Sequence, residues 1–167
     1  MASLAGQRTI EISSIGGMRD ADVQHNRLGN RRSENANRAL PVAKALLRQD
    51  GASLVVVHVV QRFATETGLA VHADEQLVKE GLQRTVEELS EEGFNATLRI
   101  VNHIGPQPAH EIADVAREVG ADRIVVGTRG HMPIAGLLLG SVTLRLLHVT
   151  PCPVLAVPAI VPAAPAE

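Results

Sequence analysis

The sequence predicts an α/β fold in which a mostly parallel sheet lies between two layers of helices. Short apolar runs at residues 54–60 and 124–126 are rich in β-branched residues and too short for helices, so they indicate buried strands. Segments with helical spacing separate such runs along the chain. This alternation predicts right-handed crossovers, which place the carboxyl ends of all strands at one edge of the sheet. A ligand site is expected at that edge, where the strand order reverses.

The elements can be assigned in order from residue 33 onward. Ser33 is a candidate cap for a helix that Gly51 ends, and Pro41 either kinks this helix or marks a later start. Asp74 is expected to cap a long amphipathic helix that Gly93 ends. The other expected elements are a strand at residues 54–60, a loop at 62–73, a strand at 96–101, a helix at 108–120, a strand from residue 124, a helix after Gly140, and a last strand at Val154–Val157.

The first 32 residues are the exception to this regularity. Residues 9–12 alternate like the start of a strand, but residues 13–32 are polar and glycine-rich and fit neither period. The expected organisation is therefore an irregular N-terminal segment at residues 1–32, one domain at residues 33–158, and a flexible tail of alanine and proline at residues 159–167.

Composition limits the classes of function. The 167 residues suit one domain, and with 45% hydrophobic but 1% aromatic residues the core must be aliphatic. A net charge of −2 argues against a surface for nucleic acid or anionic membrane. The single cysteine, Cys152, excludes an intrachain disulfide and suits a reducing compartment. With no long apolar run and no signal-peptide core at the start, the expected location is cytoplasmic.

A glycine loop follows the strand that starts at residue 124. Gly127, Gly130, Gly140 and Ser141 have the spacing G-x2-G-x9-G-S, and a helical pattern follows. Glycines let a backbone approach an anion closely, and the free N–H groups at a helix start attract a phosphate. A plain strand-to-helix crossover, in which the glycines only make turns, is the alternative interpretation.

This pattern resembles the nucleotide-binding signature of the universal stress protein family. The resemblance covers about residues 33–158 and includes His58-Val59 at the end of a strand, Gly105 with Pro108-Ala109, and Pro151-Cys152-Pro153. It implies a Rossmann-like, three-layer α/β/α fold with a five-stranded sheet. It also implies a homodimer formed through the last strand, Val154–Val157.

The resemblance also implies which residues bind the nucleotide. In ATP-binding members, the residue matching Val59 lies against the adenine, and a glycine loop with the helix start after it holds the ribose and phosphates. ATP, with Mg²⁺ as an accompanying ion, is therefore the expected ligand. The full set of implied nucleotide-binding residues is Val59, Val126, Gly127, Thr128, Arg129, Gly130, His131, Met132, Pro133, Gly140, Ser141, Val142 and Thr143.

One departure from the family concerns its first strand, an apolar run that ends in an aspartate just before a Ser-Glu pair. Here Ser33-Glu34 follows Leu28-Gly29-Asn30-Arg31-Arg32, which contains no such run. Either residues 9–12 serve as the strand and an insertion follows, or residues 13–32 are an altered stretch and the sheet lacks its middle strand. The second explanation is favoured, because a polar insertion of about 20 residues beside a ligand site is unusual for a compact domain.

Catalytic chemistry finds little support in the sequence. Ser141 and His148 are seven residues apart, roughly 10 Å along one helix at about 1.5 Å per residue, which is too far for a nucleophile and its base. The seven histidines show no ligand spacing for a metal, and only His131, in the glycine loop, is a candidate phosphate contact. No catalytic residue is assigned, and enzymatic activity beyond slow ATP hydrolysis is not expected.

Two functions therefore remain from the sequence. The first is a stress-response protein that binds a nucleotide, expected to be ATP, through the glycine loop. The alternative is a dimeric adaptor or chaperone-like interaction module of the same fold that binds no nucleotide, which the missing aspartate favours.

Overall fold

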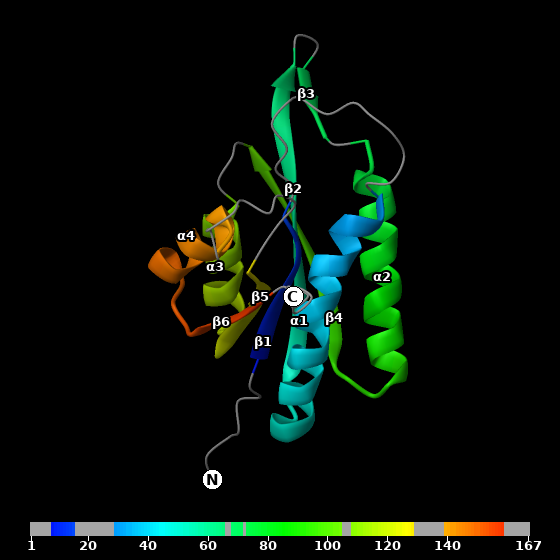
Figure 1. The fold of residues 1–167 in the computed structure, drawn as a ribbon, viewed down its shortest axis with the longest axis vertical. Coiled ribbons are helices and arrows are strands. Elements are labelled where there is room, and N and C mark those ends of the chain that lie inside the picture. Colours follow the sequence, from blue (N-terminus) through cyan, green and yellow to red (C-terminus); the bar gives the residue numbers. More distant parts are fainter. Residues whose placement is uncertain are drawn as a thin grey trace, which may run out of the picture.

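Five parallel strands form the central sheet of the protein (Figure 1). The computed structural model describes residues 8–15, 29–65, 68–71, 73–104, 108–128 and 139–158. In their order across the sheet, the five strands are β4 (Ala96–Ile104), β2 (Ser53–Thr65), β1 (Arg8–Ile15), β5 (Arg123–Gly127) and β6 (Val154–Val157). The predicted α/β fold with a mostly parallel five-stranded sheet is confirmed.

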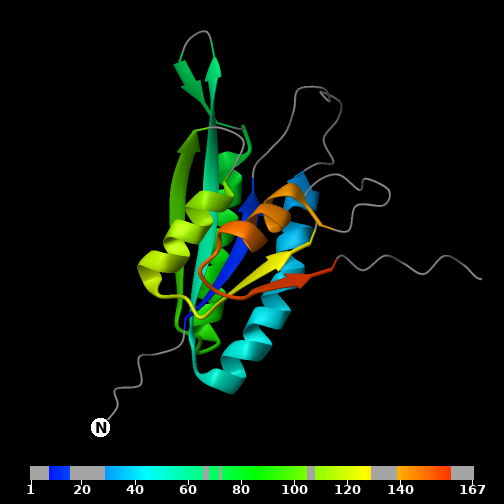
Figure 2. The ribbon, with the colours of Figure 1, turned by 90° about the vertical axis from the view of Figure 1, so that its left-hand side faces the viewer.

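Four helices cover the two faces of this sheet. The described helices are α1 (Gly29–Asp50), α2 (Glu75–Glu91), α3 (Ala109–Val119) and α4 (Ser141–Val149). Figures 1 and 2 show α1 and α2 on one face and α3 and α4 on the other. The predicted three-layer arrangement is therefore confirmed. No helix in the described part of the chain is long and apolar enough to cross a membrane.

Strand β2 explains why both faces can be buried at once. Successive side chains of a strand point to opposite faces. Leu54 and Val56 pack in the aliphatic cluster with α1 and α2, whereas Val55, Val57 and Val59 pack in the cluster with α3 and α4. An uninterrupted apolar run is therefore what a central strand between two helical layers requires.

The N-terminal strand corrects the favoured explanation of the family departure. β1 lies in the middle of the sheet and is parallel to both neighbours, so that Ile10 is in register with Val55 on β2 and with Ile124 on β5. The expectation that the sheet lacks its middle strand is wrong, and the other explanation, in which residues 9–12 serve as the strand, fits the structure. The expected irregular segment at residues 1–32 likewise does not hold for Arg8–Ile15 or from Gly29 onward. Residues 16–28 lie outside the described residues, and the proposed domain boundaries stay a prediction.

The expected loop at residues 62–73 also contains regular structure. β2 continues to Thr65, and a short antiparallel strand, β3 (Gly68–Ala70), pairs with its end. The Thr65 hydroxyl donates a hydrogen bond to the Gly68 carbonyl at 2.8 Å, and Gly68 has a φ of 134°. β4 is also longer than expected, because its pairing with β2 continues to Ile104.

Helix α1 is longer than the pattern indicates. It begins at Gly29 rather than after Ser33 and continues through Pro41, so this proline does not mark a later start. Its end is as predicted: Gly51 has a φ of 63°, which favours glycine, and its N–H donates to the Leu47 carbonyl at 2.9 Å.

Replacing Ile10 by proline tests the position of β1. In a strand paired on both sides, each backbone N–H donates a hydrogen bond to one of the two neighbouring strands, and proline has no N–H to donate. Ile10→Pro should therefore prevent cooperative folding or greatly reduce stability. Circular dichroism during thermal and urea unfolding measures the effect. Replacing Leu77, an exposed α2 residue, by alanine is the control and should change stability by no more than about 0.5 kcal/mol. An Ile10→Pro protein as stable as this control would contradict the central placement of β1.

Candidate functional site

The carboxyl ends of β1 and β5 define the candidate site. From β1 the chain proceeds to β2 and β4 on one side, and later to β5 and β6 on the other, so the strand order reverses between β1 and β5. In open α/β sheets this reversal leaves a place for a ligand beside the strand ends. β5 ends there at Gly127, and β1 ends there at Ile15.

The two ends of the glycine loop meet at this place. The Gly140 N–H donates to the Thr128 carbonyl at 2.5 Å, and the Thr143 hydroxyl donates to the Gly127 carbonyl at 3.0 Å. Thr128 is in turn joined to the sheet edge, because its N–H donates to the Val157 carbonyl at 2.8 Å. Gly127 and Gly140, which are 13 positions apart in the sequence, are therefore brought together as the motif predicts.

Helix α4 begins at the point where the loop closes. Its first turn is closed by the Leu144 N–H, which donates to the Gly140 carbonyl at 2.9 Å. The first N–H groups of a helix have no partner within the helix. For α4 these are the N–H groups of Ser141, Val142 and Thr143. With the positive end of the helix dipole, they form a group of donors that suits an anion.

The structure describes eight of the thirteen residues predicted to bind a nucleotide. Val126 and Thr128 are buried at the end of β5, and Thr143 is buried in α4, whereas Ser141 is exposed at the start of that helix. Val59 is buried on β2 and is in register with Ile15 at the end of β1. Arg129, Gly130, His131, Met132 and Pro133 lie outside the described residues, so the convergence of the third glycine, Gly130, is not tested.

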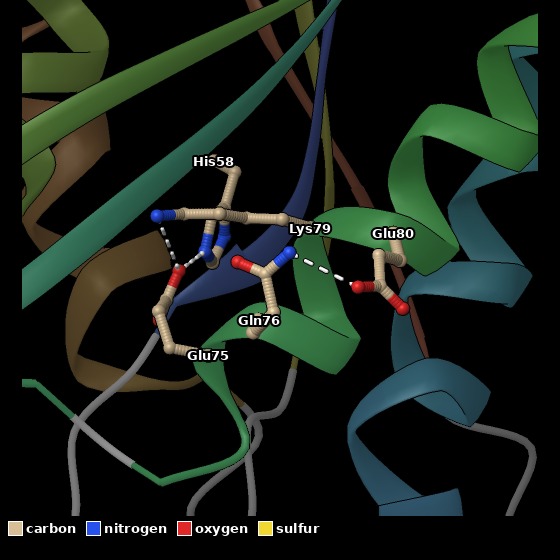
Figure 3. A network of polar contacts seen from close by, with 5 residues as sticks. All are labelled: His58, Glu75, Gln76, Lys79 and Glu80. Atoms are coloured by element: carbon tan, nitrogen blue, oxygen red, sulfur yellow. Dashed lines mark hydrogen bonds and ion pairs between the residues drawn. The ribbon is translucent and has the colours of Figure 1, made fainter.

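A buried polar pair that includes His58, in the middle of β2, was not singled out from the sequence. His58 is 1% exposed, and its Nε2 lies 2.6 Å from Oε1 of Glu75, which is 7% exposed (Figure 3). Lys79 Nζ lies 4.0 Å from the same carboxylate oxygen. Glu75 is the first residue of α2, where the helix dipole favours a carboxylate. The pair therefore joins the start of α2 to the middle of the sheet.

The available signal for this pair was a histidine within an apolar run and a glutamate directly after the expected cap. Asp74 does precede α2, but its side chain makes no capping hydrogen bond. Asp74 is therefore at the N-cap position as expected, and the buried acidic group at the start of this helix is the next residue, Glu75.

Two further polar contacts join elements on the opposite face. His103 Nδ1 on β4 lies 3.0 Å from Oε1 of Glu111 on α3, and Nη2 of Arg145 on α4 lies 3.4 Å from Nε2 of His110 on α3. Among the residues that the structure describes, no group of three or more His, Cys, Asp or Glu side chains could hold a metal ion.

Comparison with known proteins agrees with this arrangement. The model of the universal stress protein family matches residues 31–158. The chain belongs to the universal stress protein family. It is 33% identical over 140 residues to the universal stress protein YxiE of Bacillus subtilis, covering 75% of this chain and 92% of that protein. A universal stress protein of Thermus aquaticus is 34% identical over 133 residues, covering 75% of this chain and 91% of that protein.

Solved structures of family members share the fold. A universal stress protein from Archaeoglobus fulgidus, solved in complex with dAMP, has a TM-score of 0.55 at 23% identity and covers 91% of this chain and 97% of its own. A universal stress protein solved in complex with cAMP has a TM-score of 0.57 at 23% identity and covers 90% of this chain and 95% of its own. Those relatives bind nucleotides.

The family membership makes the end of β1 informative. β1 has the sequence RTIEISSI and thus does not end in the aspartate that the family resemblance implies at a first strand. The strand is present, but its last residues are Ser13, Ser14 and Ile15. The register shift between Ile12 and Ser14 falls at this same end. The end of β1 therefore differs from the pattern that the family resemblance implies.

Replacing Glu75 by alanine tests the buried pair. The change removes the acceptor next to His58 Nε2 from a buried position, so the free energy of unfolding should fall by about 1–3 kcal/mol. Urea unfolding followed by circular dichroism measures it. Glu80→Ala is the matched control on the same helix: its carboxylate contacts Gln76 at 3.0 Å in an exposed position, and its loss should cost about 0.5 kcal/mol or less. Equal costs for the two variants would mean that the pair does not stabilise the fold.

Proposed function

We propose that this universal stress protein binds a nucleotide, ATP in the first instance, at the carboxyl ends of β1 and β5. The observation that carries the proposal is the meeting of Gly127, Thr128 and Gly140 at the start of α4. It puts the free N–H groups of a helix start at the strand-order reversal, where a phosphate group fits by charge and by hydrogen bonding. The nucleotides bound by two relatives support the same class of ligand.

The donor set suits the phosphates better than a metal ion. Ser141 presents an exposed hydroxyl, and the backbone of Ser141, Val142 and Thr143 presents N–H groups, but the described residues of the loop and helix start include no carboxylate. Mg²⁺ would therefore be held chiefly by the nucleotide itself, as is usual for this ion. The proposed role is ligand binding with at most slow hydrolysis, and the single cysteine supports a cytoplasmic location.

A second function is favoured by the end of β1. The absence of an aspartate there removes one group that would position a nucleotide, which fits a non-nucleotide interaction module of the same fold. The two functions differ in what ATP does to the protein. Binding to the native state alone raises its stability by RT ln(1 + [L]/Kd), about 2.7 kcal/mol at 100 times Kd.

Thermal unfolding with and without millimolar ATP separates these two functions. The nucleotide-binding function predicts a rise in Tm that saturates with ATP concentration. Gly130→Asp should abolish this rise, because a carboxylate in the loop repels phosphate, while the ligand-free Tm stays close to that of the wild type. A folded wild-type protein whose Tm does not respond to ATP would support the adaptor function instead, and an unchanged response in Gly130→Asp would move the site elsewhere.

We also propose a homodimer formed through β6. This strand pairs with β5 on one side and forms an edge of the described sheet (Figure 2). Leu155, in the middle of β6, is 42% exposed. An exposed edge strand with an apolar side chain is a ready template for pairing with a second copy.

Replacing Leu155 by glutamate tests the dimer. A charge at the centre of the strand should disfavour its pairing with the same strand of a second copy, so the mass in solution should fall from that of a dimer to 17.7 kDa. Light scattering after size-exclusion chromatography measures the mass. Leu69→Glu is the control, since Leu69 is exposed on β3, at the other side of the sheet, and should leave the mass unchanged. A wild-type protein that is monomeric at micromolar concentration would overturn the proposal.

A further inference from the structure

Two hydrogen bonds join the two ends of the glycine loop, Gly127-Thr128 and Gly140, to each other and to α4, and we call this place the loop base. One of the two bonds uses a side chain. The Gly140 N–H to Thr128 carbonyl bond at 2.5 Å joins backbone to backbone. The second bond, from the Thr143 hydroxyl to the Gly127 carbonyl at 3.0 Å, joins the first turn of α4 to the end of β5. Thr128 and Gly140, which come before and after the glycine loop, are therefore held next to each other.

Burial decides what the Thr143 hydroxyl can do. Thr143 is 3% exposed, and a hydroxyl has a single proton to donate. In the structure that proton is used by the Gly127 carbonyl, whereas a nucleotide phosphate accepts hydrogen bonds and so needs donors. Ser141, two positions earlier on the same helix, is exposed, and its hydroxyl has no partner among the described residues. The two hydroxyl groups of the helix start are therefore not equivalent.

We infer that the Thr143 side chain is a positioning group that fixes the two ends of the glycine loop before any ligand arrives, and that its hydroxyl is not a ligand of the phosphates. This inference rests on the proposed nucleotide-binding function and refines it, because the sequence placed Thr143 among the residues that contact the nucleotide. Ser141 keeps the contacting role. Holding the loop base in the ligand-free protein lowers the ordering cost that binding would otherwise include.

Losing the hydrogen bond between Thr143 and Gly127 would weaken ATP binding for a physical reason. Without the Thr143 hydroxyl, the half-buried Gly127 carbonyl loses its side-chain donor, and β5 is joined to α4 by one hydrogen bond fewer. The N–H groups of Ser141 and Val142 then face the ligand in only a fraction of the molecules. The apparent Kd equals the intrinsic Kd divided by that fraction, so binding is weaker even though no group that touches the nucleotide has changed.

The experiment compares Thr143→Val, which keeps the shape and removes the hydroxyl, with Thr143→Ser, which keeps the hydroxyl. ATP affinity is measured by isothermal titration calorimetry. Hydrogen exchange of peptides covering residues 127–143 is measured by mass spectrometry in the absence of ATP. Thr143→Val should bind ATP about tenfold more weakly or worse and should exchange faster at the loop base, whereas Thr143→Ser should match the wild type in both.

Ser141→Ala is the matched control for a residue that contacts the ligand. It should weaken ATP binding about fivefold, the usual effect of losing one hydrogen bond, and leave the ligand-free exchange unchanged. If Thr143→Val behaves like Ser141→Ala, with weaker binding but unchanged exchange, Thr143 is a ligand contact and the inference is wrong. Unchanged ATP affinity in Thr143→Val would overturn it as well.

The readouts also separate this inference from the function on which it rests. If the wild type binds no ATP, the nucleotide-binding function fails, but the exchange of ligand-free Thr143→Val against Thr143→Ser still decides whether the hydroxyl holds the loop base. Should Thr143→Val not fold, Thr143→Ala is compared with Thr143→Ser at a temperature where both are folded by circular dichroism. Equal exchange in that pair contradicts the inference, and faster exchange in the alanine variant supports it.

Discussion

The pairing of β1 with two parallel neighbours is the constraint on which the rest of the structure depends. Because β1 is in register with β2 on one side and with β5 on the other, the chain must build the sheet outward in both directions from it. That outward growth creates the strand-order reversal and brings the end of β5 to the end of β1. The helix start, the closed loop base and the exposed Ser141 have a common location only because the middle strand is present.

Much of the fold could be predicted because burial on both faces leaves a clear record in the sequence. The run at residues 54–60 and the run at 124–126 had to be strands between two helical layers. β1 was harder to predict, since its sequence, RTIEISSI, contains polar residues and is followed by a long polar stretch. Its place depends on backbone pairing with two distant segments, and hydrophobic periodicity does not record such pairing. The hairpin of β2 and β3 was missed for a similar reason, because it is held by local pairing rather than by a buried apolar face.

The candidate site shows the same division between what a motif specifies and what it leaves open. Glycine spacing predicted that Gly127 and Gly140 would meet, and the hydrogen bonds at the loop base agree. The motif could not separate Ser141 from Thr143, since both are hydroxyl residues at the start of one helix. Only burial and hydrogen-bond partners distinguish them. The His58–Glu75 pair was beyond the reach of spacing altogether, because its members come from different elements and meet only in the folded chain.

The aliphatic core has a practical consequence for work with this protein. The chain contains no tryptophan and no tyrosine, and its only aromatic side chains besides histidine are two phenylalanines. Intrinsic fluorescence therefore cannot report its unfolding, and its near-ultraviolet absorbance is very weak. An adenine ring carried through purification would dominate the absorption spectrum of the sample, so a plain spectrum of fresh protein is itself a sensitive detector of a co-purified base.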